Sequence, residues 1–200
     1  MDFEIQRYSG RAYTAEENIS FSQSPRTHFS DVHKEMQYHK NVSHVQVSCL
    51  TQEEFDVFVK EYADQYESIY FFQNSKVKDL SALASLRNVK YLLFYNMRSA
   101  KALWDMSENR SLKGIMISAS KNLVYDLSQI SMAPALEELL LLGNMDRKYT
   151  VKSLAPIQES RSLKRVMLDC KTEDGDFDPG EFSFELFRYR VDGHRNFRYE

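Results

Sequence analysis

The sequence predicts an α/β solenoid, in which stacked repeats place a parallel sheet on the concave face. Two observations favour this fold class. A nine-residue spacing between apolar residues recurs four times, and its second member opens a pattern with apolar residues at the first, fourth and sixth positions. These openings follow one another at nearly constant intervals, which indicates repeated units that share one core. The four pairs are Leu80 and Val89, Leu103 and Leu112, Leu127 and Leu136, and Leu154 and Leu163.

The repeated pattern predicts where the strands lie. It opens at intervals of 23, 23, 24 and 27 residues, and a weaker copy opens at Val42. Because side chains alternate along a strand, we expect the first, fourth and sixth positions to face the core, and the third, fifth and seventh to face outward. Apolar residues at near-helical spacing then return the chain across the core, as in residues 77–86. The strong copies open at Tyr66, Val89, Leu112, Leu136 and Leu163.

Two stretches of these repeats resemble a known class. Residues 79–83 (DLSAL) followed by 89–92 (VKYL), and residues 126–130 (DLSQI) followed by 136–139 (LEEL), are similar to the short repeats of internalins and of leucine-rich phosphatase regulators. Together with the period, they make the chain similar to leucine-rich-repeat proteins from roughly residue 66 to residue 171. The resemblance implies a role as a regulator, an adhesin-like module, or an immunity or inhibitor protein.

The ninth position of each unit departs from those repeats. Members of the resembled class usually carry Asn there, and its amide joins a ladder of backbone hydrogen bonds. Only two of the five positions in this chain are Asn, so we expect an interrupted ladder and irregular turns. The five positions are Asn74, Met97, Ser120, Asn144 and Lys171.

We expect a single domain over residues 1–200, because no linker or low-complexity tract divides the chain. Residues 1–41 are predicted to form an irregular N-terminal cap, and residues 42–171 the repeats. Residues 172–200 are predicted to form an acidic loop and a C-terminal β-hairpin cap. Such terminal units differ from inner ones because the ends of the core need covers.

The N-terminal region contains three expected elements. Thr51 and Glu54 have the spacing of a capping box, which starts an amphipathic helix over residues 52–65. A short helix is expected to begin at residue 30 or 31 and to end at Tyr38. Residues 3–8 are expected to form a strand.

The C-terminal region predicts a hairpin. Residues 182–191 have a strand pattern, Asp192 and Gly193 form a turn dipeptide, and residues 195–199 return as a second strand. This hairpin would cover the last repeat.

Composition favours a cytoplasmic protein. The net charge of −3 at pH 7 gives no general attraction to nucleic acid or to anionic lipid. Residues 1–7 carry charge where a secretory signal needs an apolar run, and no stretch is apolar for long enough to span a bilayer. Cys49 and Cys170 fall roughly 24 Å apart at about 4.8 Å per strand, so we expect free thiols, as in a reducing compartment.

The outward strand positions carry the candidate binding site. A solvated sheet face has polar residues there, whereas five consecutive fifth positions are large and apolar in this chain. Such a patch, rich in aromatic and Met side chains, is typical of a protein interface. Its occupant could be an unidentified partner protein, the chain's own N-terminal segment or C-terminal hairpin, or a second copy in a homodimer. The nine residues of this apolar strip are Tyr70, Phe72, Tyr91, Leu93, Tyr95, Met116, Leu140, Leu142 and Met167.

An acidic constellation follows the repeats. Asp174, Asp176, Asp178 and Glu185 have the oxygen-ligand spacing of an EF-hand calcium loop. The sixth place of such a loop needs Gly for a sharp turn, and Pro179 stands there. We therefore expect a solvated acidic loop and no metal, with these four residues as the alternative ligand set.

Motifs for catalysis are missing from the sequence. It contains no nucleophile elbow, no P-loop and no zinc-ligand spacing. The arginines and aromatic residues of residues 182–200 are accompanied by acids, which argues against nucleic-acid binding.

We therefore expect a non-enzymatic protein-protein interaction module, such as an inhibitor, an immunity protein or an adaptor, without a cofactor. The alternative is a structural homo-oligomer that pairs through the same apolar strip. A third hypothesis is an enzyme whose pocket lies where the sheet meets the acidic loop.

Overall fold

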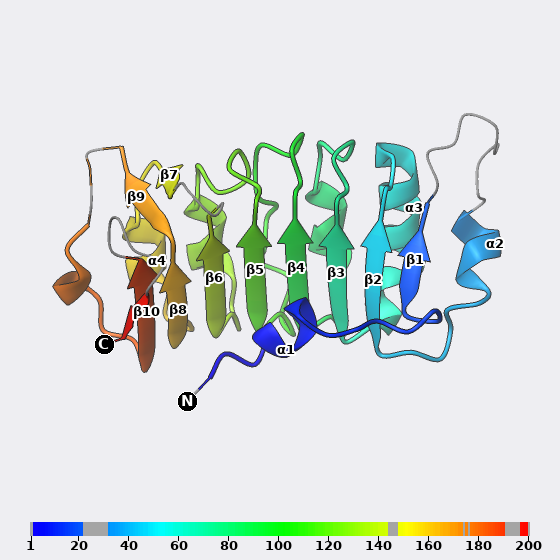
Figure 1. The fold of residues 1–200 in the computed structure, drawn as a ribbon, viewed down its shortest axis with the longest axis horizontal. Coiled ribbons are helices and arrows are strands. Elements are labelled where there is room, and N and C mark those ends of the chain that lie inside the picture. Colours follow the sequence, from blue (N-terminus) through cyan, green and yellow to red (C-terminus); the bar gives the residue numbers. More distant parts are fainter. Residues whose placement is uncertain are drawn as a thin grey trace.

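A computed structural model describes residues 2–21, 32–143, 148–173, 175 and 177–190, and the backbone of residues 197–199. Within these residues the main element is an open nine-stranded sheet in the order β1-β2-β3-β4-β5-β6-β8-β10-β11 (Figure 1). Eight strands are parallel, and β11 pairs with β10 in the antiparallel direction. The predicted α/β class with a parallel sheet is therefore confirmed.

The strands are short and evenly placed along the chain. Most have five residues, and they follow one another across the sheet in sequence order. Their bounds are β1 (Asn18–Ser20), β2 (His44–Ser48), β3 (Ser68–Phe72), β4 (Tyr91–Tyr95), β5 (Gly114–Ser118), β6 (Glu138–Leu142), β8 (Arg165–Leu168), β10 (Leu186–Arg190) and β11 (Phe197–Tyr199). A separate pair joins β7 (Tyr149–Val151) to β9 (Cys170–Thr172).

The register explains the repeat. The fourth positions of neighbouring units pair with one another, as Ile69 does with Leu92 and Leu92 with Ile115. These side chains are buried, and so are the sixth positions such as Phe71 and Phe94, whose rings stack 5.5 Å apart. The predicted inward positions therefore build the core.

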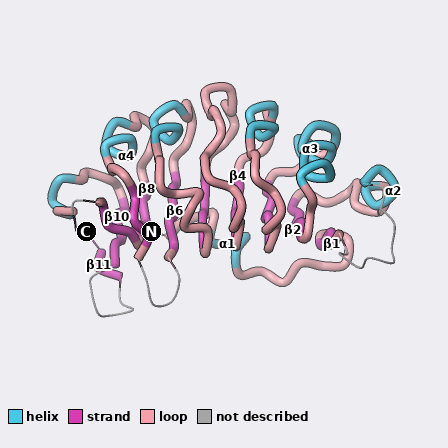
Figure 2. Tube along the Cα trace, turned by 90° about the horizontal axis from the view of Figure 1, so that it is seen from above, coloured by secondary structure: helices cyan, strands magenta, loops and turns pink. Residues whose placement is uncertain are grey.

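Helical segments cover one face of the sheet. Figure 2 shows them in a row on the outer side of the strands, while the opposite face is left to the chain ends. Each is short because it only has to return the chain to the next strand. They are α3 (Gln52–Glu61) and α4 (Ala155–Glu159), with the 3-10 helices η1 (Ala63–Gln65), η2 (Ser81–Ser85) and η3 (Ser128–Met132).

The predicted capping box is confirmed at the start of α3. The Thr51 side chain accepts a hydrogen bond from the Glu54 amide, and the Glu54 carboxylate accepts one from the Thr51 amide at 2.7 Å. The α-helix ends at Glu61, earlier than predicted, because the chain tightens into η1 before β3. The predicted short helix before β2 is α2 (Val32–Met36).

A left-handed residue follows each of four successive strands. Cys49, Gln73, Asn96 and Ala119 have φ between 51° and 64°, a region that L-residues enter at some cost. The turn is held by the neighbouring unit, since the Gln73 amide donates to the Tyr95 carbonyl at 2.8 Å. In the next unit, the Asn96 amide donates an equivalent hydrogen bond to the Ser118 carbonyl. These turns repeat the same geometry along one edge of the sheet.

The ladder at the ninth positions is interrupted as predicted. Asn74 is fully buried; its amide donates to the Val47 carbonyl and its side-chain oxygen accepts from the Leu50 amide, both at 2.8 Å. Ser120 substitutes with a hydroxyl that accepts from the amide of Met97. The side chain of Met97 has no amide or hydroxyl group with which to continue the ladder. Asn144 lies outside the described residues.

The two chain ends differ from the predictions. Residues 3–8 do not form a strand; the segment contains α1 (Gln6–Ser9) and crosses the sheet face. The predicted hairpin is confirmed by β10 and β11, although its turn at residues 192–193 lies outside the described residues. The first strand begins at Leu186 and not at Phe182, because the 3-10 helix η4 (Pro179–Glu181) and a cluster of phenylalanines precede it.

Both cysteines are unpaired. Cys170 is buried, and this burial raises the pKa of its thiol to about 12. No helix in the described part of the chain is long and apolar enough to cross a membrane.

The Asn74 ladder generates a stability test. The change Asn74→Ala leaves a buried amide and a buried carbonyl without their partners, so we expect the free energy of unfolding to fall by about 2 kcal/mol or more. Urea denaturation of the variant measures this loss. The matched change at the exposed Asn41, Asn41→Ala, is expected to stay within about 0.5 kcal/mol of the natural protein. Equal losses in the two variants would contradict the ladder.

Candidate functional site

The sheet face opposite the helices is partly covered by the chain's own N-terminal segment. We call residues 2–13 the strap. It passes across the N-terminal ends of the strands, with α1 lying over β3 to β5 (Figures 1 and 2). Its apolar side chains form a second cluster with the outward residues of the sheet, separate from the main core.

Glu138 fastens the strap to the sheet. This carboxylate at the start of β6 is 1 % exposed, and its two oxygens accept hydrogen bonds from the amides of Glu4 and Ile5, each at 2.9 Å. The guanidinium Nε of Arg165 on the neighbouring strand lies 2.8 Å from the same carboxylate. The buried charge is thus both paired and hydrogen-bonded, as a buried carboxylate requires.

Aromatic contacts continue the attachment. The ring of Tyr8 lies 5.0 Å from that of Tyr91 and 4.9 Å from that of His44. Burial lowers the pKa of His44, so the neutral imidazole is favoured beneath the strap. Tyr13 closes the strap by donating a hydrogen bond to the carbonyl of Tyr8.

Gly114 makes room for this packing. A Cβ atom at this first residue of β5 would lie 2.8 Å from Tyr91 Cδ1 and 3.2 Å from Ile5 Cδ1. Glycine therefore lets the Tyr91 ring and the strap lie against the backbone. The strap's position depends on this small residue as well as on Glu138.

Six of the nine residues of the apolar strip are buried within the single chain. All six have less than a tenth of their surface exposed, because the strap and Leu186 pack against them. The self-cover that the sequence left open therefore accounts for this part of the face, with the N-terminal segment as the cover. The six residues are Tyr70, Tyr91, Leu93, Met116, Leu140 and Met167.

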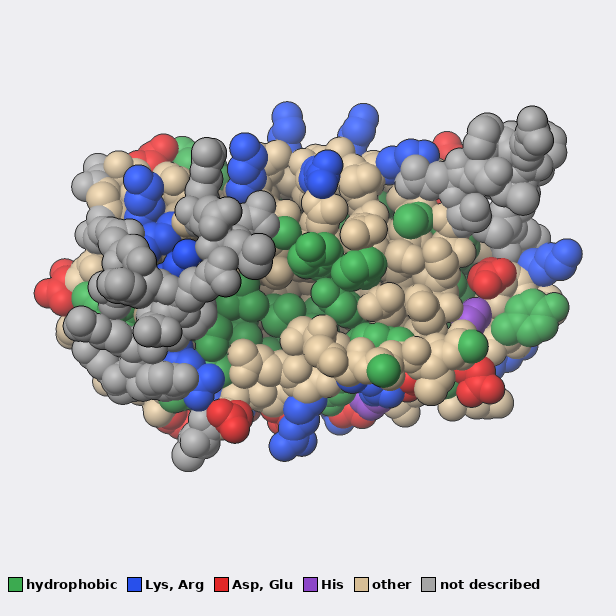
Figure 3. Space-filling model, in the orientation of Figure 1, with side chains coloured by type: hydrophobic (Ala, Val, Ile, Leu, Met, Phe, Trp, Pro, Cys, Tyr) green, Lys and Arg blue, Asp and Glu red, His purple; other side chains and the backbone are tan. Residues whose placement is uncertain are grey.

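The other three predicted residues remain partly exposed. Phe72, Tyr95 and Leu142 stand at the seventh position of their units and pack against the edge of the second cluster. Ser118 lies between Tyr95 and Leu142 in the register. The rings of Phe72 and Tyr95 stack 5.1 Å apart at an angle of 9°. We call these four residues the open strip. Figure 3 shows hydrophobic side chains in a hollow across the middle of this face.

A buried ion pair borders the open strip at the seventh position of the next unit. Asp169 is 4 % exposed and lies 3.0 Å from the Nη1 atom of Arg190. It also accepts a hydrogen bond from the amide of Gly143. Burial raises the pKa of Asp169, although the guanidinium of Arg190 opposes this shift.

A pocket of about 1100 Å³ adjoins the open strip. It lies where the chain leaves β4 and β5 and enters β7. We call it the basic pocket because four of its described lining residues are cations and none of these described residues carries a carboxylate. Its lining residues in the described part of the chain are Tyr95, Asn96, Arg98, Lys101, Ala119, Lys121, Asn122, Tyr125, Lys148, Tyr149 and Thr150.

Hydrogen bonds shape the walls of the basic pocket. The hydroxyl of the buried Tyr149 accepts from the amide of Ser120 at 2.8 Å, and burial raises the pKa of this hydroxyl to about 12. Arg98 donates from Nε to the side-chain oxygen of Asn96 at 2.7 Å. Tyr125 is 43 % exposed and donates to Glu173. The pocket therefore presents aromatic rings and cationic groups on a fixed backbone.

The sequence prediction missed the basic pocket because its residues come from loops of different units. One signal was present: Arg98 and Lys121 each stand three residues after the end of a strand, at equivalent places in neighbouring repeats. Aligning the loops of neighbouring repeats, like the strands, gives these two cations equivalent positions on adjacent units.

Only two of the four alternative calcium ligands, Asp178 and Glu185, lie in the described part of the chain. The carboxylate of Asp178 accepts a hydrogen bond from the amide of Gly180 at the start of η4. Glu185 immediately precedes β10. Asp174 and Asp176 lie outside the described residues. Within the part that the structure describes, no group of three or more His, Cys, Asp or Glu side chains is placed to hold a metal ion.

Comparison with known proteins gives one match. The profile of a protein family with the description "Domain of unknown function (DUF4848)" matches residues 16–135. This range covers β1 to η3 and begins just after the strap. No curated protein and no solved structure matches the chain.

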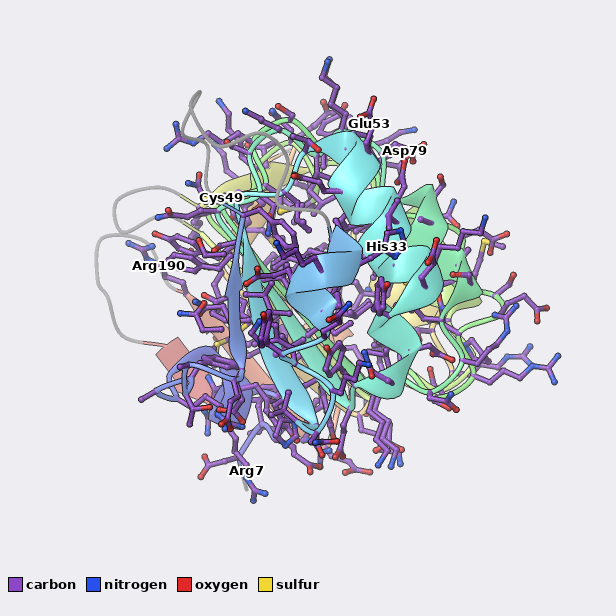
Figure 4. All side chains as sticks on the ribbon, turned by 90° about the vertical axis from the view of Figure 1, so that its right-hand side faces the viewer. Arg7, His33, Cys49, Glu53, Asp79 and Arg190 are labelled. Atoms are coloured by element: carbon purple, nitrogen blue, oxygen red, sulfur yellow. The ribbon has the colours of Figure 1, made fainter. Side chains whose placement is uncertain are left out.

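The attachment of the strap can be tested at Glu138. Glu138→Gln replaces one accepting oxygen with a donor and removes the charge opposite Arg165, so we expect a loss of about 1–3 kcal/mol in the free energy of unfolding. The loosened strap should also be cut faster by trypsin after Arg7, whose side chain points into solvent (Figure 4). Urea denaturation and timed digestion measure the two effects.

Its neighbour provides the control. Glu137 carries the same charge but is one-third exposed and pairs with Lys164 at the surface. We expect Glu137→Gln to change stability by less than about 1 kcal/mol and to leave the cleavage rate unchanged. Similar cleavage rates in the two variants would contradict the role of Glu138.

Proposed function

Because this chain belongs to the DUF4848 family, a domain of unknown function, we propose its role from its own surface: a non-enzymatic module that binds a partner protein on the open strip. We further propose that the module is a leucine-rich-repeat solenoid. The strand order, the register of equivalent positions and the recurring left-handed turn support this architecture. So does the Asn74 ladder bond, which joins neighbouring units.

One observation carries the binding proposal: the stacked pair Phe72 and Tyr95 stays partly exposed at the edge of the covered apolar cluster. The apolar residues at the third and fifth positions are covered, whereas those at the seventh positions stay partly open. Aromatic side chains on a rigid sheet lose little conformational freedom when a partner covers them, and they are favoured at interfaces. The uncovered pair therefore suits a docked protein.

The binding surface is smaller than the sequence suggested. Of the nine predicted residues, only Phe72, Tyr95 and Leu142 belong to the open strip. The proposal keeps the roles of inhibitor, immunity protein or adaptor as the class of function. The two unpaired cysteines support a reducing compartment, so we propose the cytoplasm as its location.

A homo-oligomer that uses the whole apolar strip would have to displace the strap. It would break the bonds of Glu138 to the strap and expose Phe3 and Ile5, which are buried in the single chain. A dimer on the open strip alone needs no such change. The experiment below distinguishes this pairing from a heterologous partner.

The test is affinity capture from a native lysate with the natural chain and with Phe72→Glu/Tyr95→Glu. These changes place two carboxylates on the open strip and leave every residue of the strap unchanged. We expect the natural chain to retain a protein that the double variant loses. Thermal melting of both chains checks that the variant is folded.

A change at Tyr38 provides the matched control. This tyrosine is 70 % exposed and follows α2 at the far end of the sheet. Tyr38→Glu should capture the same partner as the natural chain. Identical captures by the natural chain and the double variant would refute binding on the open strip, and capture of the chain's own copy alone would favour the oligomer.

A further inference from the structure

We propose that the basic pocket binds an acidic segment of the partner polypeptide that docks on the open strip. This inference rests on the proposed function and adds the chemistry of the partner. The two surfaces are continuous, because Tyr95 lies in the open strip and also lines the pocket. One polypeptide can therefore contact both.

The charge of the pocket argues for an anionic occupant. Its described lining contains Arg98, Lys101, Lys121 and Lys148 and no carboxylate. The whole chain has an excess of acids, with 29 Asp and Glu against 26 Lys and Arg. The concentration of cations in one hollow is therefore a local departure from the average, and it creates a positive field that attracts carboxylates.

Two described carboxylates, Glu173 and Asp169, interact with residues that line the pocket. Glu173 accepts a hydrogen bond from the Tyr125 hydroxyl at 2.8 Å at its edge. Asp169 acts electrostatically on Lys148 but is itself paired with Arg190. Within the described residues, Lys101 and Lys121 have exposed side chains that reach the pocket from adjacent loops.

Neutral groups add recognition of a peptide chain. Asn122 and Thr150 are exposed in the pocket and offer hydrogen-bonding groups, and Tyr125 offers an exposed ring. A peptide backbone and its carboxylates can use such groups together. The pocket can thus contact a peptide through hydrogen bonds and an aromatic ring as well as through charge.

The arrangement of charge favours a polypeptide over a nucleic acid. The open strip consists of Phe72, Tyr95, Ser118 and Leu142, none of which is charged. A nucleic acid carries a phosphate on every nucleotide and needs cations along its whole track. A polypeptide can place apolar side chains on the strip and carboxylates in the pocket.

The experiment uses a fluorescein-labelled peptide with an apolar half and a glutamate-rich half. Fluorescence anisotropy measures its binding to the natural chain and to Lys101→Glu/Lys121→Glu. We expect the natural chain to bind the peptide, with affinity that falls as salt is added. The double variant should bind about tenfold more weakly, because two attractions become repulsions.

Three controls make the result specific. Lys34→Glu/Lys60→Glu changes the net charge equally at exposed sites on α2 and α3, and it should bind the peptide like the natural chain. A peptide with glutamine in place of glutamate should bind far more weakly. A single-stranded oligonucleotide of equal charge should not compete better than the glutamate peptide.

Several results would overturn the inference: no binding to the natural chain, equal binding of the glutamine peptide, equal losses in both lysine variants, or stronger binding of the oligonucleotide. The proposed function fails separately. A partner that is lost with Phe72→Glu/Tyr95→Glu but retained by Lys101→Glu/Lys121→Glu would leave the open strip as the binding surface and would refute the acidic segment.

Discussion

The inner strands carry apolar side chains on both faces, so both faces of the sheet have to be covered. In β4, Leu92 and Phe94 point to the helices, whereas Tyr91 and Leu93 point to the opposite side, and all four are buried. Stacked return segments cover the first face, as repetition requires. On the second face, the strap and Leu186 cover the outward residues at the third and fifth positions. Among the described residues, Phe72, Tyr95 and Leu142 stay partly exposed beside the strap.

Much of the fold was predictable from the sequence because its determinants are periodic. The position of Ile115 in β5 follows from the repeat interval, and its burial follows from the alternation of side chains along a strand. The strap was not predictable in the same way, because it depends on a contact between residues 133 positions apart, Ile5 and Glu138. The alternation of Phe3 and Ile5 resembled a strand, whereas the Glu138 carboxylate gives the amides of Glu4 and Ile5 a partner outside any strand pairing. The sequence did contain one sign of the strap: Glu138 is an acidic residue among the apolar outward positions of the sheet.

The candidate site was predicted only in part, for a related reason. Tyr95 and Leu142 were identified because outward strand positions can be read from the repeat. Their neighbours Lys101 and Lys121 stand in loops, where no alternation of side chains fixes direction. The open strip and the basic pocket become one surface only when the loops of adjacent units are placed side by side, with Tyr95 common to both.

Whether the strap lies on the sheet in solution is measured most directly by a nuclear Overhauser experiment on the intact chain. Cross-peaks are predicted between the ring protons of Tyr8 and Tyr91, whose centroids are 5.0 Å apart. The pair Phe71 and Phe94, at 5.5 Å inside the core, serves as the internal reference. Cross-peaks for both pairs would establish the covered face. Cross-peaks for the core pair alone would contradict it and would return the whole apolar strip to the binding surface.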